Sequence, residues 1–268
     1  MNAPLKLMCV LAHPDDESLG AGGVLAKYAA EGIETYLVTA TRGERGWPGD
    51  PKDNPGLEAL GRLREAELRC AAQNLGIREV SLLDYVDGDL DQARPSDAIA
   101  KIAQLIRQVR PHVVVTFGPD GIYGHPDHIA ICQFATAATM RAADPNYHTN
   151  GHPPHGVSKL YYMMPTTAEL KAYESVFGDL VMHVDGVDRR GSGWQDWTVT
   201  TLVDTGDYWP TVWKAVSCHR TQLSVYGALQ NLPEEHHRAL WGCRSYYRAY
   251  STVNGGRKLE QDLFEGLR

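Results

Sequence analysis

The sequence of 268 residues has few cysteines, no excess of basic residues, no long apolar run and no repeated or low-complexity segment. Its 26 lysine and arginine residues are outnumbered by 33 aspartate and glutamate residues, which gives a formal net charge of −7. A chain this acidic lacks the electrostatic footprint of a protein that binds the phosphate backbone, so nucleic acid is not expected as a partner. The balance of apolar and charged residues also excludes a disordered or fibrous chain.

The five cysteines are odd in number, are scattered along the chain and form no Cys-x-x-Cys pair. We therefore expect five unpaired thiols, with neither a disulfide framework nor a zinc site built on thiolates, as suits a reducing cytoplasm. The first apolar run, Leu5–Leu11, is too short to span a bilayer, and no small-residue cleavage site follows it. The sequence thus predicts a cytoplasmic protein that does not insert into membranes.

Short apolar runs with β character alternate with helical patterns along the first half of the chain. This alternation predicts an α/β, Rossmann-like three-layer fold with a mostly parallel sheet and an irregular C-terminal part. The expected strands are 5–12, 34–40, 79–83, 112–117, 159–164, 199–203 and 244–251, and the expected helices are 22–31, 56–75, 95–109, 129–142 and 208–217.

No linker-like change of composition separates the two halves of the chain. We therefore expect one domain over residues 1–268, with an α/β core in 1–143 and a C-terminal part in 144–268 that adds a loop and a sheet edge. The segment 144–156 is rich in proline, glycine, asparagine and histidine and is expected to be a loop. The last segment, 259–267, is amphipathic and is expected to pack against the body of the protein.

The first motif with chemical content is His13-Pro14-Asp15-Asp16-Glu17, which follows the first expected strand. Sites in open parallel sheets form at the carboxyl ends of strands, where this motif lies. Zinc and similar divalent metals accept imidazole nitrogen together with carboxylate oxygen, and a cation would relieve the repulsion between two adjacent aspartates. Alternatively, Asp16 or Ser18 caps the next helix, and His13 is a turn residue.

A second motif, His125-Pro126-Asp127-His128, follows the strand 112–117 through a loop rich in glycine and proline. It also lies at the carboxyl end of a strand, so the two motifs can converge although they are far apart in sequence. Three protein ligands and one open position are typical of a catalytic metal site. In the alternative interpretation the histidines are solvated loop residues, and Asp127 is a helix N-cap.

Together the two motifs resemble those of the PIG-L-like (LmbE-like) family of metal-dependent deacetylases that act on N-acetylglucosamine conjugates. That family includes enzymes of mycothiol and bacillithiol synthesis. The resemblance covers most of the chain and also includes three supporting segments: Thr39–Glu44, Arg64–Leu68 with Leu75-Gly76, and His219–Gln222.

The resemblance implies that His13, Asp16 and His128 bind the metal, which is expected to be Zn²⁺, with Fe²⁺ as the alternative. Asp15 would be the general base that takes a proton from an activated water molecule, and His125 the oxyanion donor and general acid. Asp127 would orient His125 or His128.

Five further positions have weaker support. Tyr123 resembles a family tyrosine that supports the oxyanion, but it could equally be a packed loop aromatic. Arg64 falls where the family contacts a sugar or phosphate group, and it could instead pair with Glu67 on its own helix. Asp84, like Asp87, could bind sugar hydroxyls or form a turn. His219 is either a substrate contact or a capping or core histidine.

The remaining histidines are expected to lie outside the site. The loop histidines are predicted to mark a mobile segment instead of a second metal site, because prolines interrupt any regular ligand spacing. His236 and His237 are expected at the solvated surface. The loop histidines are His148, His152 and His155.

The implied function is removal of an N-acetyl group from an N-acetylated amino-sugar conjugate, a small-molecule substrate. The alternatives are hydrolysis of a larger thiol- or sugar-conjugate amide at the same site, and a non-catalytic sugar-binding protein of the same fold. A pure binding protein would have no need of the base Asp15 or the acid His125, which favours an enzyme. The sequence leaves the acyl group, the native metal and the oligomeric state open.

Overall fold

A seven-stranded mixed sheet forms the centre of the computed structural model, which describes residues 4–147, 151–178, 181–184 and 186–268. The strand order is β3-β2-β1-β4-β5-β9-β8, in which the first five strands run parallel and the last two antiparallel to their neighbours. The prediction of a mostly parallel α/β fold is confirmed. The strands are β1 (Lys6–Leu11), β2 (Glu34–Thr41), β3 (Glu79–Tyr85), β4 (Val113–Phe117), β5 (Lys159–Met163), β8 (Thr201–Asp204) and β9 (Cys243–Ser251).

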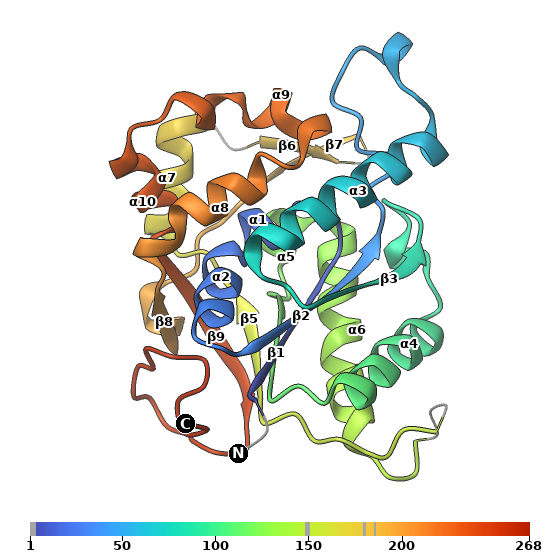
Figure 1. Ribbon diagram of the computed structural model, residues 1–268, viewed down its shortest axis with the longest axis vertical. Coiled ribbons are helices and arrows are strands. Elements are labelled where there is room, and N and C mark those ends of the chain that lie inside the picture. Colours follow the sequence, from blue (N-terminus) through green and yellow to red (C-terminus); the bar gives the residue numbers. More distant parts are fainter. Residues whose placement is uncertain (1–3, 148–150, 179–180, 185) are drawn as a thin grey trace.

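Helices cover both faces of this sheet. One group consists of α2 (Gly22–Ala30), α3 (Leu57–Leu75) and α8 (Trp209–Val216), which pack against one another (Figure 1). The other consists of α4 (Pro95–Val109) and α6 (Pro126–Ala143), which pack together and against β1 and β4. Helix α3 ends at Gly76, whose φ of 72° lies in the left-handed region that glycine adopts without strain.

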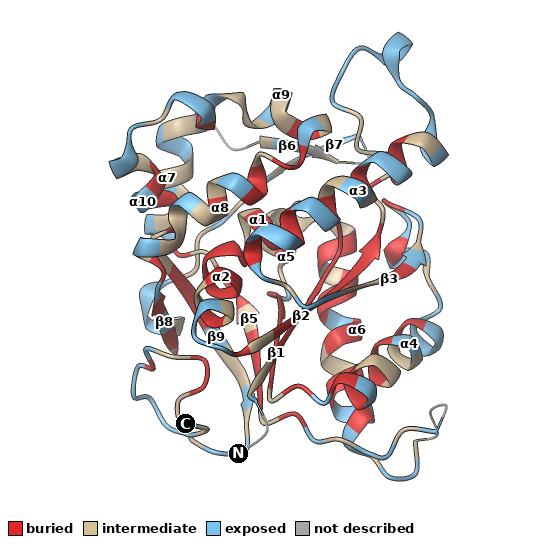
Figure 2. Ribbon diagram, viewed as in Figure 1, coloured by how far each residue is buried: buried red, intermediate tan, exposed pale blue. Residues whose placement is uncertain are grey.

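The hydrophobic core lies between the sheet and these helices. Every residue of β4 is buried, and Leu7–Leu11 of β1 are at most 1% exposed. Figure 2 shows the buried residues concentrated in the central strands and on the helix faces that are turned toward them. Parallel strands covered on both faces read as continuous apolar runs, which is why these strands were predictable.

The strand order places a crevice at the carboxyl ends of β1 and β4. From β1 the chain continues to β2 on one side, whereas from β4 it continues to β5 on the other side. Crevices at such a reversal of strand order bind ligands in open α/β sheets. The loop that follows β1 carries α1 (Asp16–Leu19), and the loop that follows β4 carries α5 (Gly121–Gly124).

The C-terminal part contains elements that sequence patterns did not reveal. These are α7 (Thr167–Phe177), a hairpin of β6 (Val181–Val184) and β7 (Val187–Arg190), α9 (Leu223–Tyr226) and α10 (Glu234–Trp241). The segment 259–267 packs back as expected, because Leu263 and Phe264 are fully buried. Among the described residues, no helix is long and apolar enough to cross a membrane.

A disulfide joins Cys70 of α3 to Cys218, across 148 positions of sequence. The prediction of five unpaired thiols is therefore wrong for these two residues, while the other three cysteines are free. Sequence spacing carries no signal for this pair, because it depends on the contact between α3 and the segment that follows α8. An odd number of scattered cysteines therefore does not exclude a single disulfide between two of them.

The structure shows the environments of two histidines that were predicted to lie outside the site. His237 is only 4% exposed and packs its ring against Trp209, Trp213 and Trp241, so its prediction as a solvated residue is wrong. In the loop 144–156, the His155 ring bonds the Pro111 carbonyl, whereas His148 lies outside the described residues.

A buried glutamate anchors the C-terminal segment to the sheet. Glu260 is 1% exposed and accepts hydrogen bonds from Lys159 (2.6 Å), Thr201 (2.6 Å) and Tyr161 (2.7 Å). Burial alone would raise the pKa of this carboxyl, but these donors outweigh burial and lower the pKa to about 2. The pKa of a glutamate in the unfolded chain is about 4.3. The lower pKa in the folded state means that folding stabilises the charged form of Glu260.

We therefore expect the stability that Glu260 contributes to be complete above about pH 5 and to be lost as the pH falls toward 2. The free energy of unfolding of the wild type and of Glu260→Gln, measured in urea at pH steps between 6 and 3, tests this expectation. The variant should show a smaller loss of unfolding free energy over that range, whereas Glu58→Gln, at an exposed position, should follow the wild type. An equal slope for Glu260→Gln and wild type would contradict the assignment.

Candidate metal centre

Three side chains from the two motifs converge at the crevice between β1 and β4. The His13, Asp16 and His128 donor atoms all lie within 4.8 Å of one another. The His128 Nε2 atom is 3.3 Å from His13 Nδ1 and 3.6 Å from Asp16 Oδ1. The predicted ligand set is thus brought together by the fold, across more than a hundred positions of sequence.

The orientation of the His13 ring is set by carboxylates on its far side. Its Nε2 atom lies 3.0 Å from Asp127 Oδ2 and 3.1 Å from Asp87 Oδ1. Both are acceptors, so Nε2 carries a ring proton, and Nδ1 is the nitrogen that faces Asp16 and His128. Histidines that bind metals characteristically donate the second ring N–H to a carboxylate in this way.

Asp127 is fully buried and holds several groups at once. Besides His13, it accepts hydrogen bonds from the backbone N–H groups of Gly88 (2.8 Å) and Leu90 (3.0 Å). Its carboxylate orients His13 where we expected it to orient His125 or His128. The helix α6 is capped instead by His125, whose Nδ1 accepts the Asp127 N–H, so the interpretation of Asp127 as an N-cap does not hold.

The electrostatics of the three donors reflect their burial among like charges. Burial raises the pKa of Asp16 to about 7, with the neighbouring Asp15 charge adding to the effect. Burial would lower the pKa of His13, but its bonds to Asp127 and Asp87 raise it well above the ordinary value. Burial and the nearby His13 charge lower the pKa of His128 far below the usual histidine range.

This arrangement fits a divalent cation. Four aspartates, Asp15, Asp16, Asp87 and Asp127, surround two imidazoles in a largely buried space. A cation would neutralise that charge and allow both rings to be neutral ligands. Two ligands of a tetrahedral zinc, each about 2.0–2.1 Å from the metal, lie about 3.3 Å apart. This matches the 3.3 Å between the two imidazole nitrogens.

Asp15 lies beside this donor set in a strained conformation. Its φ of 103° is in the left-handed region, which residues other than glycine adopt at a cost and chiefly at functional sites. Its Oδ2 atom accepts hydrogen bonds from Tyr226 (2.8 Å) and Arg64 (3.1 Å). Its backbone N–H donates to the Glu17 carboxylate at 3.0 Å. Hydrogen bonds therefore hold both the backbone and the side chain of Asp15.

His125 and Tyr123 line the same site. The His125 ring stacks on His128 at 4.6 Å between centroids, and the Tyr123 ring meets both histidines edge-on. Since His125 Nδ1 accepts a backbone N–H, the neutral ring carries its proton on Nε2. Burial, followed by the charges of Asp16 and Asp15, raises the pKa of Tyr123, which therefore stays a neutral hydrogen-bond donor.

The three predicted substrate-binding residues lie in different environments. Arg64 is 4% exposed and donates to the carbonyls of Gly43 (2.8 Å) and Pro14 (2.6 Å) as well as to Asp15, so its partner is not Glu67. Asp84 is at the surface and forms an ion pair with Arg42.

His219 is fully buried and pairs with Glu17. Arg64 and His219 thus contact Asp15 and Glu17 of the first motif.

Sequence reasoning missed two residues that hold the site. Glu17 is fully buried between His219 (2.7 Å) and the Asp15 N–H, and Tyr226 reaches Asp15 from 211 positions away. The acidic run at positions 15–17 contained a signal for Glu17, since three adjacent carboxylates are more than one helix N-terminus needs as caps. No pattern near Tyr226 indicated its contact.

The sequence of this chain is similar to those of known proteins. The family described as PIG-L, GlcNAc-PI de-N-acetylase, matches residues 8–139. A 1D-myo-inositol 2-acetamido-2-deoxy-alpha-D-glucopyranoside deacetylase of Catenulispora acidiphila is 32% identical over 98% of both chains.

Two solved structures share the fold. The N,N'-diacetylchitobiose deacetylase of Pyrococcus horikoshii matches with a TM-score of 0.67 at 20% identity, over 91% of this chain and 83% of that one. The 4-carboxy-2-hydroxymuconate hydratase of Pseudomonas putida matches with a TM-score of 0.66, also at 20% identity, over 94% and 99%.

Proposed function

The chain belongs to the PIG-L family, and on that premise we propose that it hydrolyses the acetamide of an N-acetylglucosamine conjugate and releases acetate. The observation that carries this proposal is the convergence of His13, Asp16 and His128 beside a separate carboxylate, Asp15. A set of two imidazoles and one carboxylate with a neighbouring base is suited to activating water. The deacetylase activity named for the relative from Catenulispora acidiphila supports the same reaction.

We propose His13 Nδ1, His128 Nε2 and Asp16 as the metal ligands. A bound divalent ion, Zn²⁺ or alternatively Fe²⁺, would acidify a water molecule and polarise the amide carbonyl. Asp127 and Asp87 keep the His13 ring turned so that Nδ1 faces the site. Their hydrogen bonds would make the ring a stronger ligand and keep the remaining proton on Nε2 when an ion displaces the one on Nδ1.

Asp15 is proposed as the general base. Tyr226 and Arg64 both donate to Oδ2, which leaves Oδ1 as the oxygen that accepts a proton from the attacking water. Arg64 acts in this scheme as a positioning residue, because it also ties the Pro14 carbonyl to that of Gly43. The orientation of the Asp15 carboxylate is thus set by Tyr226 and by Arg64, which is itself held by the carbonyls of Pro14 and Gly43.

His125 and Tyr123 are proposed to act on the opposite side of the scissile bond. The proton on His125 Nε2 can stabilise the oxyanion that forms when water adds to the carbonyl. As the general acid, His125 then passes a proton to the nitrogen of the leaving amine, and the proton that Asp15 took from the water returns to His125, so that the ring stays neutral. Tyr123, whose raised pKa keeps its hydroxyl protonated, is placed to donate a second hydrogen bond.

The proposed substrate is a small N-acetylated amino sugar, and the enzyme is proposed to act in the cytoplasm as one domain of residues 1–268. The participation of β8 and β9 in the central sheet supports a single domain. Asp84, with its partner Arg42, is proposed to contact substrate hydroxyls at the rim.

The test is an assay of acetate and free amine on a panel of amides. We expect equal amounts of acetate and amine from 1D-myo-inositol 2-acetamido-2-deoxy-α-D-glucopyranoside. Its kcat/KM should exceed that of an N-acetyl amino acid by at least about tenfold. A higher kcat/KM for a bulky thiol-conjugate amide would move the proposal to that substrate class. Binding of the sugar without acetate release from any amide would refute hydrolysis.

Tyr226 provides a separate prediction, because its hydroxyl is one of two donors to Asp15. Tyr226→Phe removes that donor and keeps the ring, so kcat should fall about tenfold, as expected for losing a hydrogen bond to a charged group. KM should change little, because Tyr226 is assigned to the base and not to substrate. Steady-state kinetics measure both, with Tyr250→Phe, at an exposed position of β9, as control. An unchanged kcat would show that Arg64 alone fixes Asp15.

A further inference from the structure

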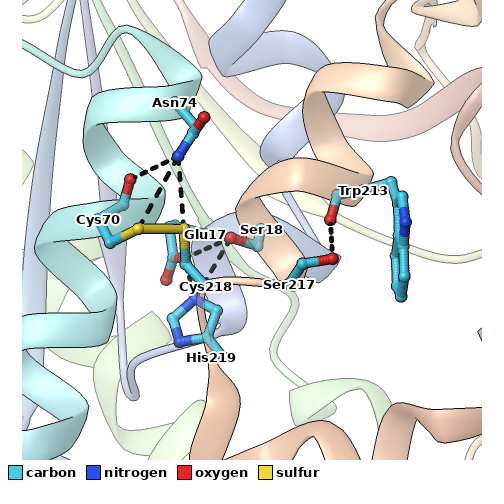
Figure 3. Close-up of a disulfide and its surroundings, with 8 residues drawn as sticks. All are labelled: Glu17, Ser18, Cys70, Asn74, Trp213, Ser217, Cys218 and His219. Atoms are coloured by element: carbon cyan, nitrogen blue, oxygen red, sulfur yellow. Dashed lines mark hydrogen bonds and ion pairs between the residues drawn. A yellow bond between two sulfur atoms is a disulfide. The ribbon is translucent and has the colours of Figure 1, made fainter. Parts of the chain in front are cut away.

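The Cys70–Cys218 disulfide lies directly beside the residues that support the candidate base (Figure 3). Cys70 is on α3, the helix that also carries Arg64. Cys218 immediately precedes His219, whose Nε2 atom is 2.7 Å from Glu17 Oε1. The bridge therefore ties together two of the segments that position Asp15.

The two bridged cysteines differ in their exposure to solvent. Cys70 is exposed, whereas Cys218 is 8% exposed. The Asn74 side chain lies over the bridge, with its Nδ2 atom 3.4 Å from Cys218 Sγ and 3.9 Å from Cys70 Sγ. An attacking thiolate thus reaches Cys70 Sγ more easily, and the Asn74 N–H can stabilise the Cys218 thiolate that leaves.

Hydrogen bonds also hold the segment 218–222, in which His219 and Gln222 are buried. Thr221 donates to Glu67 of α3 through its backbone N–H (2.9 Å) and its hydroxyl (2.7 Å), and Gln222 donates to the Gly46 carbonyl (2.8 Å). His219 pairs with Glu17, and Glu17 in turn accepts the backbone N–H of Asp15. A short path, Cys218–His219–Glu17–Asp15, therefore connects the bridge to the candidate base.

We propose that this disulfide is a thiol-exchange site through which low-molecular-weight thiols control the hydrolytic site, an inference that rests on the proposed function. One thiolate attacks Cys70 Sγ, forms a mixed disulfide and releases Cys218 as a thiolate, which takes up a proton. A second thiolate attacks the small-molecule sulfur of the mixed disulfide and frees Cys70. Two small thiols are oxidised to one disulfide, and the protein disulfide gains two electrons and two protons.

Opening the bridge removes the covalent link between the segment 218–222 and α3. His219 then holds Glu17 less firmly, and Glu17 holds the strained backbone of Asp15 less firmly. The reduced enzyme should therefore be folded and able to bind metal but less active. Reoxidation should restore the activity, because both cysteines stay within reach of each other.

The experiment uses the full-length, metal-loaded protein in buffers of reduced and oxidised glutathione. Alkylation with mass spectrometry reports the state of Cys70 and Cys218, while acetate release and amide hydrogen exchange are measured on the same samples. On reduction we expect turnover to fall about tenfold and reversibly, with faster exchange at the amides of Asp15 and Thr221. Metal content should be the same in both states.

Matched variants identify the cysteines responsible. Cys243→Ser should keep the response to glutathione, whereas Cys70→Ser should have low turnover in both buffers. Equal turnover and equal exchange in the two redox states would overturn the proposal, as would free Cys70 and Cys218 thiols in oxidised glutathione. If neither redox state releases acetate, the proposed function fails. The rates of amide hydrogen exchange at Asp15 and Thr221 in the two states still decide whether the disulfide controls the site.

Discussion

Asp15→Asn should lower kcat by about 10³-fold or more while the bound metal is retained. General base catalysis contributes typically about 10²–10⁴-fold, and an amide cannot take the proton that the attacking water must lose. The residue is held for this task by Tyr226 and Arg64 at Oδ2 and by Glu17 at its backbone N–H. Because asparagine is nearly isosteric, the backbone and the neighbouring ligands should keep their places.

The measurement is acetate release under saturating substrate, together with metal content and circular dichroism of the purified variant. Asp53→Asn, at an exposed position outside the crevice, serves as the control and should match the wild type. If Asp15→Asn kept more than about a tenth of the wild-type kcat, another group would have to be the base.

Asp127→Ala should weaken metal binding by about 10–100-fold, the range seen when the partner of a metal-binding histidine is lost. Its carboxylate holds the His13 Nε2 atom and two backbone N–H groups in a fully buried position. Without it, the His13 ring can rotate or change tautomer, and the Gly88 and Leu90 N–H groups lose their acceptor. Competition with a chromophoric chelator measures the affinity.

Asp127→Asn is the informative companion variant, because it keeps one acceptor oxygen and should lose less affinity than the alanine variant. Asp97→Ala on the exposed surface of α4 should have no effect. Wild-type affinity in a folded Asp127→Ala protein would show that His13 needs no support from this carboxylate, and would leave Asp87 as the residue that orients the ring.

The central sheet was predictable from sequence because its strands are buried on both faces. Runs such as Val113–Phe117 read as continuous apolar segments, and proline or glycine marks several of the helix ends. Strand pairing then follows from the alternation of strands and helices. The C-terminal part was harder, because its elements are short and partly exposed. A capping box at Thr166 and Glu169 was nonetheless available to indicate α7.

The convergence of the two motifs was also predictable, since both follow neighbouring parallel strands. Which atom contacts which partner was not predictable. The contact of Asp127 with His13 was not predicted, because it depends on how the two motifs meet in the folded chain. The Cys70–Cys218 bridge and the contact of Tyr226 with Asp15 likewise depend on packing between distant segments.

The central claim is that one divalent ion, bound by His13, Asp16 and His128, makes this chain an N-deacetylase. The most direct test is to titrate metal-free protein with Zn²⁺ while measuring acetate release from 1D-myo-inositol 2-acetamido-2-deoxy-α-D-glucopyranoside. We predict no turnover without metal, a linear rise to a plateau at about one equivalent, and no rise for His128→Ala. Full turnover by metal-free protein, or a wild-type titration curve for His128→Ala, would contradict it.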